Sequence, residues 1–397
     1  MTTTRTPAAR PTSTARSPAP DLARGAMLAA IALANVMVYL FDRPYGLRHH
    51  IIEDGLTNQV VTAVLTATVD ARAYPMFAVL YGYGLARIAA SRTARDWPPA
   101  QVRSYLQRRS VGLIVLGATH ALLAFSGDIL GWYGLLGLLL AGASTRWSDR
   151  RLVLTALVAL PPAALVQGVI YSDPTVRHDR GVFWSMAIEE PLSAALWRSI
   201  EWLMAPFGLL AVAAALLVGV VAGRRDLLSD VMSRRRSLGL ATFVGIAIGW
   251  LGGLPMALAT AHLVQLPPGS ELWFSTLHIF SGVSCGLGYA ALAGWLCSHA
   301  TFVRSAPARA LRATGARSLT CYLAQSVVFA AVLPAWSLGL GATLGSASAA
   351  GLALLTWLVT VILAVLLERR GTQGPAERLL RWFTRARPWP RAATIVR

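Results

Sequence analysis

The chain alternates between long apolar stretches and short polar connections. Ten stretches come close to the length of about 20 residues that an α-helix needs to cross the hydrocarbon core of a membrane. They lie at residues 25–42, 73–90, 110–127, 128–145, 152–171, 203–223, 238–261, 273–298, 318–338 and 348–367. This pattern predicts an all-α fold, a polytopic integral membrane bundle of about ten transmembrane helices.

The composition agrees with a membrane-embedded bundle. Hydrophobic residues make up 55% of the 397 residues and charged residues 14%, whereas a soluble domain has about 25% charged residues. The three cysteines lie within apolar stretches and lack the spacing of a zinc site or a disulfide framework. We therefore expect a single bundle and no metal site.

The basic residues predict how the bundle is oriented. All 36 are arginines, and the net charge is +18. Thirty of them fall in the tails and in alternate connections, and six fall on the opposite side, at positions 43, 48, 72, 177, 180 and 198. Because cytoplasmic loops are rich in basic residues, we expect both termini in the cytoplasm of a multi-pass protein of the cell membrane. Arginines spread over membrane-facing loops do not indicate nucleic-acid binding.

The polar segments divide the chain into three parts. Residues 1–20 are predicted to form a disordered cytoplasmic tail, residues 21–384 the transmembrane bundle, and residues 385–397 a basic cytoplasmic tail. A long outer segment, 172–202, mixes aromatic and charged residues. It is interpreted either as an interfacial belt at the membrane surface or as a cover over an outward-facing site.

Two polar residues frame the hairpin formed by the third and fourth stretches. His120 and Asp128 both fall in the outer half of the membrane. A carboxylate beside an imidazole fixes its tautomer and raises its basicity, so the two could form a catalytic base with its orienting acid. The alternative is a hydrogen-bonded core histidine that holds the hairpin together.

A second pair of histidines lies in the first outer loop. His49 and His50 are flanked by Arg48, Glu53 and Asp54, an arrangement that could supply a general base and an orienting acid. Histidines of an exposed loop can equally be without a role. Further along, His262 and His278 are interpreted as structural.

The first apolar stretch begins with polar residues. Asp21 and Arg24 are three apart and can pair on one face of a helix at the cytoplasmic surface. Asn35 lies about three turns further along, near the middle of the membrane, where its amide needs hydrogen-bond partners.

Several blocks together resemble the YeiB-like bacterial membrane family, domain of unknown function 418. They are DLARGAMLAAIALAN (21–35), FAVLYGYGLAR (77–87), RRSVGLIVLGATHALLAFSGDILGWYGLLGLLL (108–140), GARSLTCYLAQS (315–326) and RRGTQGPAERLLRWFT (369–384). The family is distantly similar to the transmembrane acyltransferase superfamily. That resemblance implies transfer of an acyl group from a cytosolic donor such as acyl-CoA to an acceptor across the membrane.

The resemblance also implies roles for particular residues. The superfamily carries an Asp, an Arg-Gly pair and a polar residue in its first span, here Asp21, Arg24 with Gly25, and Asn35, so these residues are expected at the donor site. Where the O-acyltransferases have a catalytic His, this chain has Asn35, which cannot act as a general base. The heparan-type branch shares that Asn and uses a His of the following luminal loop, which implies His49 or His50 as the base.

The resemblance continues with Asp70 and with Tyr74 followed by Pro75, in a matching Asp, aromatic, Pro order. His120 with Asp128 remains the second candidate for the base. Two positions depart from the family pattern: Cys321 replaces an Asn, and the usual aromatic is missing after Pro375.

Three functions are therefore considered. The first is an acyltransferase that uses acyl-CoA, with no permanently bound cofactor, to modify a hydroxyl or amine of an envelope glycan, a lipid or a secreted metabolite. The second is a transporter or exporter of a small molecule, and the third is a non-catalytic membrane scaffold. Besides the lipid bilayer, the expected partners are the donor and the acceptor, and the sequence leaves the oligomeric state open. Motifs for nucleotide hydrolysis, zinc peptidases and serine hydrolases do not occur in the sequence.

Overall fold

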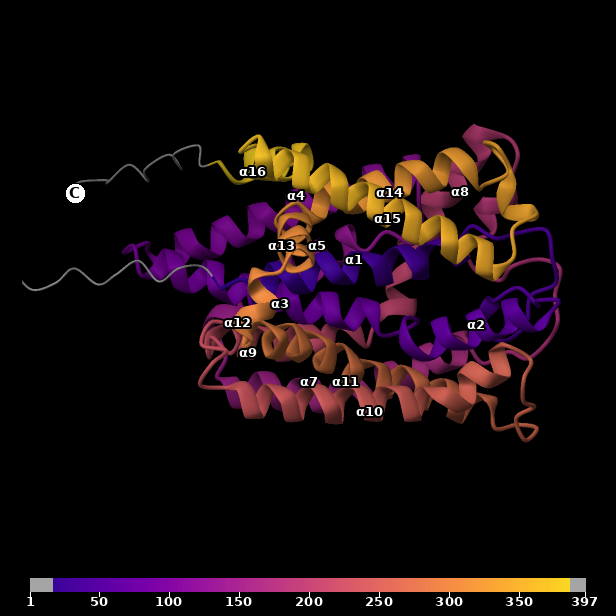
Figure 1. Cartoon of the computed structure of the whole chain (residues 1–397), viewed down its shortest axis with the longest axis horizontal. Helices are drawn as coiled ribbons and strands as arrows, with labels where there is room; N and C mark the ends of the chain where they lie inside the picture. Colours follow the sequence, from indigo (N-terminus) through magenta and orange to yellow (C-terminus); the bar gives the residue numbers. More distant parts are fainter. Residues whose placement is uncertain (1–16, 386–397) are drawn as a thin grey trace, which may run out of the picture.

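The computed structural model describes residues 17–385, so most of both predicted tails lies outside the described residues. The fold is all-α and 75% helical, as predicted, and the described residues form only isolated β-bridges, at Tyr45. The helices that run along the long axis are α1 (Ala19–Val38), α3 (Ala73–Thr93), α4 (Pro99–Leu123), α7 (Asp149–Ile170), α9 (Val212–Arg224), α10 (Arg235–Thr260), α11 (Glu271–Cys297), α14 (Ser318–Val332) and α15 (Ser346–Arg369) (Figure 1).

Shorter elements complete the bundle. They are η1 (Leu47–His49), α2 (Leu56–Thr68), α5 (Leu130–Leu140), α6 (Ala143–Arg146), η2 (Trp184–Ala187), α8 (Pro191–Met204), η3 (Ala205–Leu209), α12 (Ala300–Arg304), α13 (Ala306–Ala316), η4 (Leu340–Ala342) and α16 (Pro375–Thr384).

Six helical segments between residues 17 and 385 are long and apolar enough to cross a membrane. They are α1, α2 with α3, α7, α10, α11 and α15, and a seventh results if the bent pair of α8–η3 and α9 is one span. The apolar helices α5 and α14 are shorter than a full crossing. The structure thus supports a membrane-spanning bundle, while the count of ten spans stays a prediction.

Two predicted stretches differ from the helices that form, and helix α2 lies outside every predicted stretch. The stretch 128–145 contains α5, with only 11 residues, and then α6. The stretch 203–223 starts in a 3₁₀ turn before α9 begins. Helix α2 was missed altogether, because the Thr, Asn and Gln residues of LTNQVVTAVLTAT dilute its apolar character.

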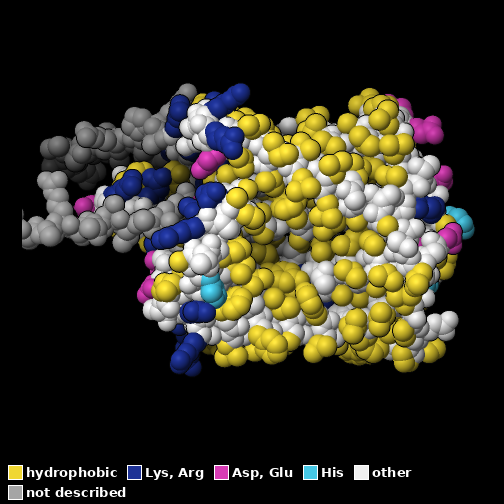
Figure 2. Space-filling view, in the orientation of Figure 1, with side chains coloured by type: hydrophobic (Ala, Val, Ile, Leu, Met, Phe, Trp, Pro, Cys, Tyr) yellow, Lys and Arg dark blue, Asp and Glu magenta, His cyan; other side chains and the backbone are white. Residues whose placement is uncertain are grey.

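Charge separates the two ends of the bundle. Apolar side chains cover its middle, arginines gather at one end, and acidic and histidine side chains show at the other (Figure 2). We call these the arginine-rich and the arginine-poor end. The start of α1 and helices α12, α13 and α16 lie at the arginine-rich end, so both ends of the described chain lie there (Figure 1). The loops 39–55 and 171–190 lie at the arginine-poor end.

Close approach of helix backbones holds the bundle together. A side chain at Gly82 of α3 would place its Cβ 2.2 Å from the carbonyl oxygen of Leu216 in α9. A side chain at Gly219 of α9 would likewise fall 2.2 Å from the carbonyl oxygen of Val79. Between apolar helices in a bilayer, such packing replaces the hydrophobic driving force that water supplies to a soluble core.

This packing predicts that Gly219→Leu destabilises the protein by about 2 kcal/mol or more, because the helices must separate to admit the side chain. The measurement is the melting temperature of the purified protein in detergent. The control is Gly351→Leu in α15, where an added Cβ meets nothing within 4 Å. Equal melting temperatures for the two variants would contradict the packing argument.

Candidate functional site

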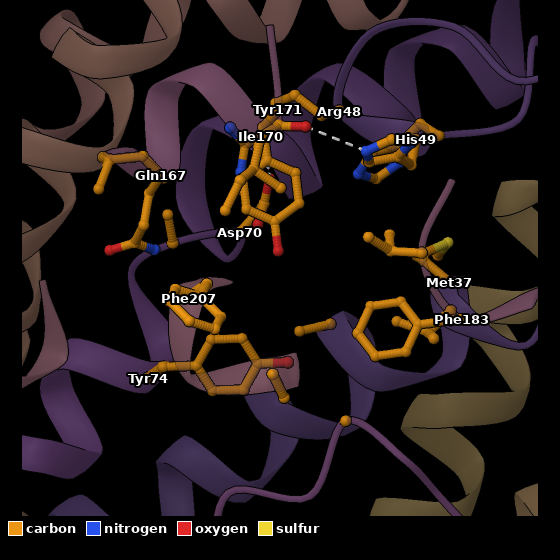
Figure 3. Close-up of a pocket in the computed structure, with 18 of the residues that line it drawn as sticks. Met37, Arg48, His49, Asp70, Tyr74, Gln167, Ile170, Tyr171, Phe183 and Phe207 are labelled. Atoms are coloured by element: carbon orange, nitrogen blue, oxygen red, sulfur yellow. Dashed lines mark hydrogen bonds and ion pairs between the residues drawn. The ribbon is translucent and has the colours of Figure 1, made fainter. Parts of the chain in front are cut away.

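A cavity of about 310 Å³, which we call the main cavity, lies near the arginine-poor end (Figure 3). Its walls come from α1, the α2–α3 junction, α7, the segment from α8 to α9, and the loops 39–55 and 171–190. Most of the lining is apolar, with rings that include Tyr74, Phe183 and Phe207. The polar groups among its lining residues are Arg48, His49, His50, Asp70, Tyr74, Gln167, Tyr171, Arg180 and Glu201.

His49 is held in one orientation at the cavity wall. Its Nε2 lies 3.1 Å from the carbonyl oxygen of Ile170, and its ring meets the ring of Tyr171 edge-on (Figure 3). Because a carbonyl only accepts, Nε2 carries the proton in a neutral ring and Nδ1 is left as an acceptor. Burial, and next the charge of Arg180, lower the pKa of His49 to about 4.

His50 also lines the main cavity. No hydrogen bond joins its imidazole to another described residue. Burial lowers the pKa of His50 to about 4, while the carboxylate of Asp70 opposes this shift. Both imidazoles are therefore neutral at pH 7 and can accept a proton.

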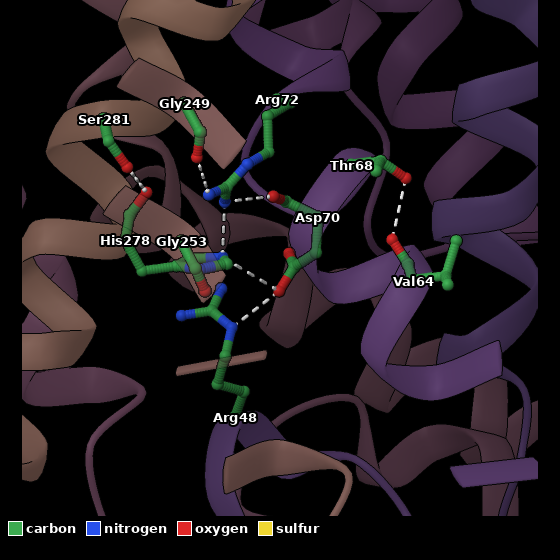
Figure 4. A network of polar contacts seen from close by, with 9 residues as sticks. All are labelled: Arg48, Val64, Thr68, Asp70, Arg72, Gly249, Gly253, His278 and Ser281. Carbon is green, nitrogen blue, oxygen red and sulfur yellow. Dashed lines mark hydrogen bonds and ion pairs between the residues drawn. The ribbon is translucent and has the colours of Figure 1, made fainter. Parts of the chain in front are cut away.

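The α2–α3 junction places Asp70 beside the histidines. Helix α2 ends at Thr68 and α3 begins at Ala73, so Asp70 lies in the break. The Arg48 Nε donates to Asp70 Oδ2 at 2.6 Å, which ties the first loop to the break (Figure 4).

Arg72 closes the same break from the inside and is completely buried. Its Nη1 donates to the carbonyl oxygen of Asp70 at 2.7 Å and lies 2.6 Å from His278 Nε2, and its Nη2 donates to the carbonyl oxygen of Gly249 at 2.9 Å (Figure 4). Since a guanidinium only donates, His278 accepts at Nε2 and is neutral.

The glycines of α10 make room for this side chain. A Cβ at Gly253 would lie 1.7 Å from Arg72 Nη2, and the side chain of Cys285 fills the corresponding space at Gly249. The glycines of α10 therefore accommodate a buried cation as well as a neighbouring helix.

Strained backbone gathers around the main cavity. Among the described residues other than Gly, Asp and Asn, five have a left-handed φ: Arg48, His49, Ala71, Phe183 and His262. The first four line the main cavity. Side chains raise the energy of this conformation, and clusters of such residues are typical of functional sites.

Part of the segment 172–202, which we call the cover, lines the main cavity. Tyr45 and Arg177 exchange two backbone hydrogen bonds, of 2.7 and 3.1 Å, that join the two loops. Beyond this bridge, residues 180 and 182–184 line the cavity. The rest of the segment forms α8, which exposes Leu192, Leu196 and Trp197.

His120 and Asp128 meet, but outside the main cavity. His120 Nδ1 lies 2.8 Å from Asp128 Oδ1, and both residues are buried. Asp128 Oδ2 accepts from the backbone N–H of Gly131. The His120 ring packs edge-on against Tyr322, and Phe125 stands between it and Phe183 of the cavity wall. The pair joins α4 to the turn before α5, and neither residue lines the cavity.

The residues expected at the donor site lie in two different places. Asp21 and Arg24 form an ion pair of 3.2 Å at the arginine-rich end. Asn35 instead accepts a hydrogen bond of 3.0 Å from the hydroxyl of Tyr74, which lines the main cavity. Asn35 follows Arg24 by eleven residues, which is about 16 Å along the helix. Leu28 and Ile31, both completely buried, fill this interval.

Sequence reasoning missed Arg48, Arg180 and Glu201 as cavity residues. Arg48 and Arg180 belong to the six arginines of the arginine-poor side, and this scarcity was the available signal. Within residues 17–385, no group of three or more His, Cys, Asp or Glu side chains is placed to hold a metal ion.

The fold and the site define a helical membrane protein with a polar cavity near one end. Residues 222–387 match the model of the family described as "Protein of unknown function (DUF418)", the family that the sequence blocks resemble. No curated protein matches the chain. Of the residues that line the main cavity, only Ile279 falls in the matched region.

The two lowered pKa values predict a loss of stability in acid. Between pH 6.5 and about 4, the unfolded chain binds protons at His49 and His50 that the folded protein does not, so stability falls as the pH falls through this window. Each imidazole accounts for up to about 3 kcal/mol, at about 1.4 kcal/mol per pKa unit. The measurement is the melting temperature from pH 7.5 to 4.5.

The double variant His49→Gln/His50→Gln should flatten this dependence. His178→Gln, in the exposed part of the cover, is the matched control and should keep it. An unchanged slope in the double variant would show that other groups cause the acid sensitivity.

Proposed function

We propose that the protein is a membrane acyltransferase that moves an acyl group from acyl-CoA to a hydroxyl or amine at the outer face of the cell membrane. The observation that carries the proposal is the pair of neutral imidazoles, His49 and His50, in one cavity with Asp70 and Tyr74. This is the group of residues that the resemblance to the heparan-type branch implies.

In this mechanism one imidazole acts as the general base. His50 is the better placed, because its ring has no hydrogen-bond partner among the described residues, whereas His49 is bound to Ile170. The acceptor hydroxyl or amine attacks the acyl carbonyl carbon and gives its proton to the imidazole. The C–S bond then breaks, and the proton passes to the thiolate of CoA. Asp70 orients the site through its ion pair with Arg48.

The donor is proposed to bind at the arginine-rich end, which faces the cytoplasm by the positive-inside rule. Arg24 is the candidate for its phosphates, because guanidinium groups form strong charge-assisted hydrogen bonds with phosphate. The acyl group then has to pass Leu28 and Ile31, so α1 must shift during turnover.

A second candidate function is transport. It is favoured by the interrupted α2–α3 span, because ionisable residues at a break beside a cavity are typical of transporter binding sites. A transporter moves its cargo without an acyl donor, which separates the two functions.

The acyltransferase mechanism predicts that His50→Gln slows acyl transfer by about 10²-fold or more, the usual contribution of a general base. The assay follows the release of free CoA from acetyl-CoA by the protein in lipid nanodiscs, with glucosamine or glycerol as trial acceptors. His178→Gln should transfer at the wild-type rate. If His120→Gln abolishes transfer and both His50→Gln and His49→Gln retain it, the base is misassigned.

The donor site predicts that acetyl-CoA or a longer acyl-CoA raises the melting temperature of the purified protein, since a ligand that binds only the folded state stabilises it. Arg24→Gln should remove this shift. Arg225→Gln should keep it, because Arg225 lies at the same end and is exposed in an ion pair with Asp149. No shift with any acyl-CoA, for protein shown to be folded, would exclude a CoA donor and favour transport.

A further inference from the structure

Arg180 is the cation of the main cavity that lacks a carboxylate partner. Its Nη1 donates to the carbonyl oxygens of Val38 and Leu40, at the end of α1, and its guanidinium lies over the rings of Tyr45 and Phe183. Within the described residues, no carboxylate lies within ion-pair distance of it. Its Nε is buried without a partner, and its Nη2 makes no hydrogen bond to a described residue.

Glu201, which lines the same cavity, does not fill this role. Its carboxylate accepts from Ser126 Oγ at 2.5 Å, from the Ser185 backbone N–H at 2.7 Å and from Ser185 Oγ at 2.6 Å. These three hydrogen bonds hold the carboxylate, and no ion pair between described residues joins it to the guanidinium.

The charged side chains of the cavity lining are two arginines, Arg48 and Arg180, and two carboxylates, Asp70 and Glu201. Arg48 is paired with Asp70, and Arg72 contacts the backbone of the same residue. Glu201 and Arg180 attract each other through space without forming an ion pair, while the nearby histidines are neutral. A buried guanidinium with an unsatisfied N–H group and no ion-pair contact is costly, and an anion bound to it reduces that cost.

The rest of the cavity lining indicates that the ligand also has an apolar part. Tyr74, Phe183 and Phe207 surround the hollow with aromatic faces (Figure 3). Met37 and Met204, two unbranched and adaptable side chains, also line it. Such a surface suits an apolar body joined to the anionic group, and a purely polar anion would leave it uncovered.

We propose that the main cavity binds an amphiphile whose anionic group, a carboxylate or a phosphate monoester, is held by Arg180 while its apolar part packs on the aromatic side chains. As far as this amphiphile is the acyl acceptor, the inference rests on the proposed function. A negative charge beside His49 and His50 also raises their pKa values, so the ligand itself makes the two imidazoles stronger bases.

Binding of three probes with the same aromatic ring tests this directly. Phenylacetate and phenyl phosphate carry the two anionic groups, and phenylacetamide is the uncharged analogue. Each is titrated calorimetrically into the full-length protein in phosphatidylcholine nanodiscs, without any acyl donor. We expect at least one anion to bind at least 10-fold more tightly than the amide. The tighter of the two anions tells a carboxylate ligand from a phosphate monoester.

Arg180→Gln should remove the preference for the anions and leave binding of phenylacetamide unchanged. Arg177→Gln is the matched control and should keep the preference, because Arg177 lies three residues away on the same loop, exposed and paired with Asp173. Arg180→Lys retains the positive charge and a hydrogen-bond donor for the carbonyl oxygens at the end of α1, so it should also bind the anions more tightly than the amide. This variant keeps the test valid if Arg180→Gln fails to fold.

Equal affinities for anions and amide in the wild-type protein would overturn the inference. So would a preference that survives Arg180→Gln, or no binding of any probe to folded protein. Each of these results leaves the acyl-transfer assay unaffected. Conversely, anion binding without acyl transfer would uphold this site and remove the proposed function.

Discussion

A charged side chain between apolar helices has to find its partners within the protein, because hydrocarbon offers no water to solvate it. Arg72 meets this constraint with the carbonyl oxygens of Asp70 and Gly249 and with the imidazole of His278. These bonds hold the break between α2 and α3 in one geometry. They thereby fix the direction of α3 relative to α2. The position of Asp70 and Tyr74 at the main cavity follows from that geometry.

The cover depends on the same requirement at the arginine-poor end. Arg180 satisfies carbonyls at the end of α1, and Ser185 satisfies the carboxylate of Glu201 from α8. The bridge between Tyr45 and Arg177 joins the two loops. The hydrogen bonds of Arg180, those of Ser185 and the backbone bridge at Arg177 therefore hold the cover over the cavity. Each of these attachments also gives a buried polar group a hydrogen-bond partner.

Local sequence patterns predicted the helical membrane class, and the short spacing of His120 and Asp128 suggested their contact across a hairpin. The family resemblance directed attention to His49 and His50. What remained hidden depends on contacts between distant positions: Arg72 meets His278 across 206 residues, and no periodicity signals such a pair. The length of each helix could not be predicted from the sequence either. A bend or break inside an apolar stretch leaves its hydrophobicity unchanged.

The space around Arg72 has a consequence for how the sequence can vary. Its guanidinium occupies the volume that any side chain larger than hydrogen would need at Gly253. A homologue with a shorter residue at position 72 would leave that volume empty, and a larger residue at position 253 would fill it. The two positions, 181 residues apart, are therefore expected to covary, and this coupling would mark which relatives keep the interrupted helix.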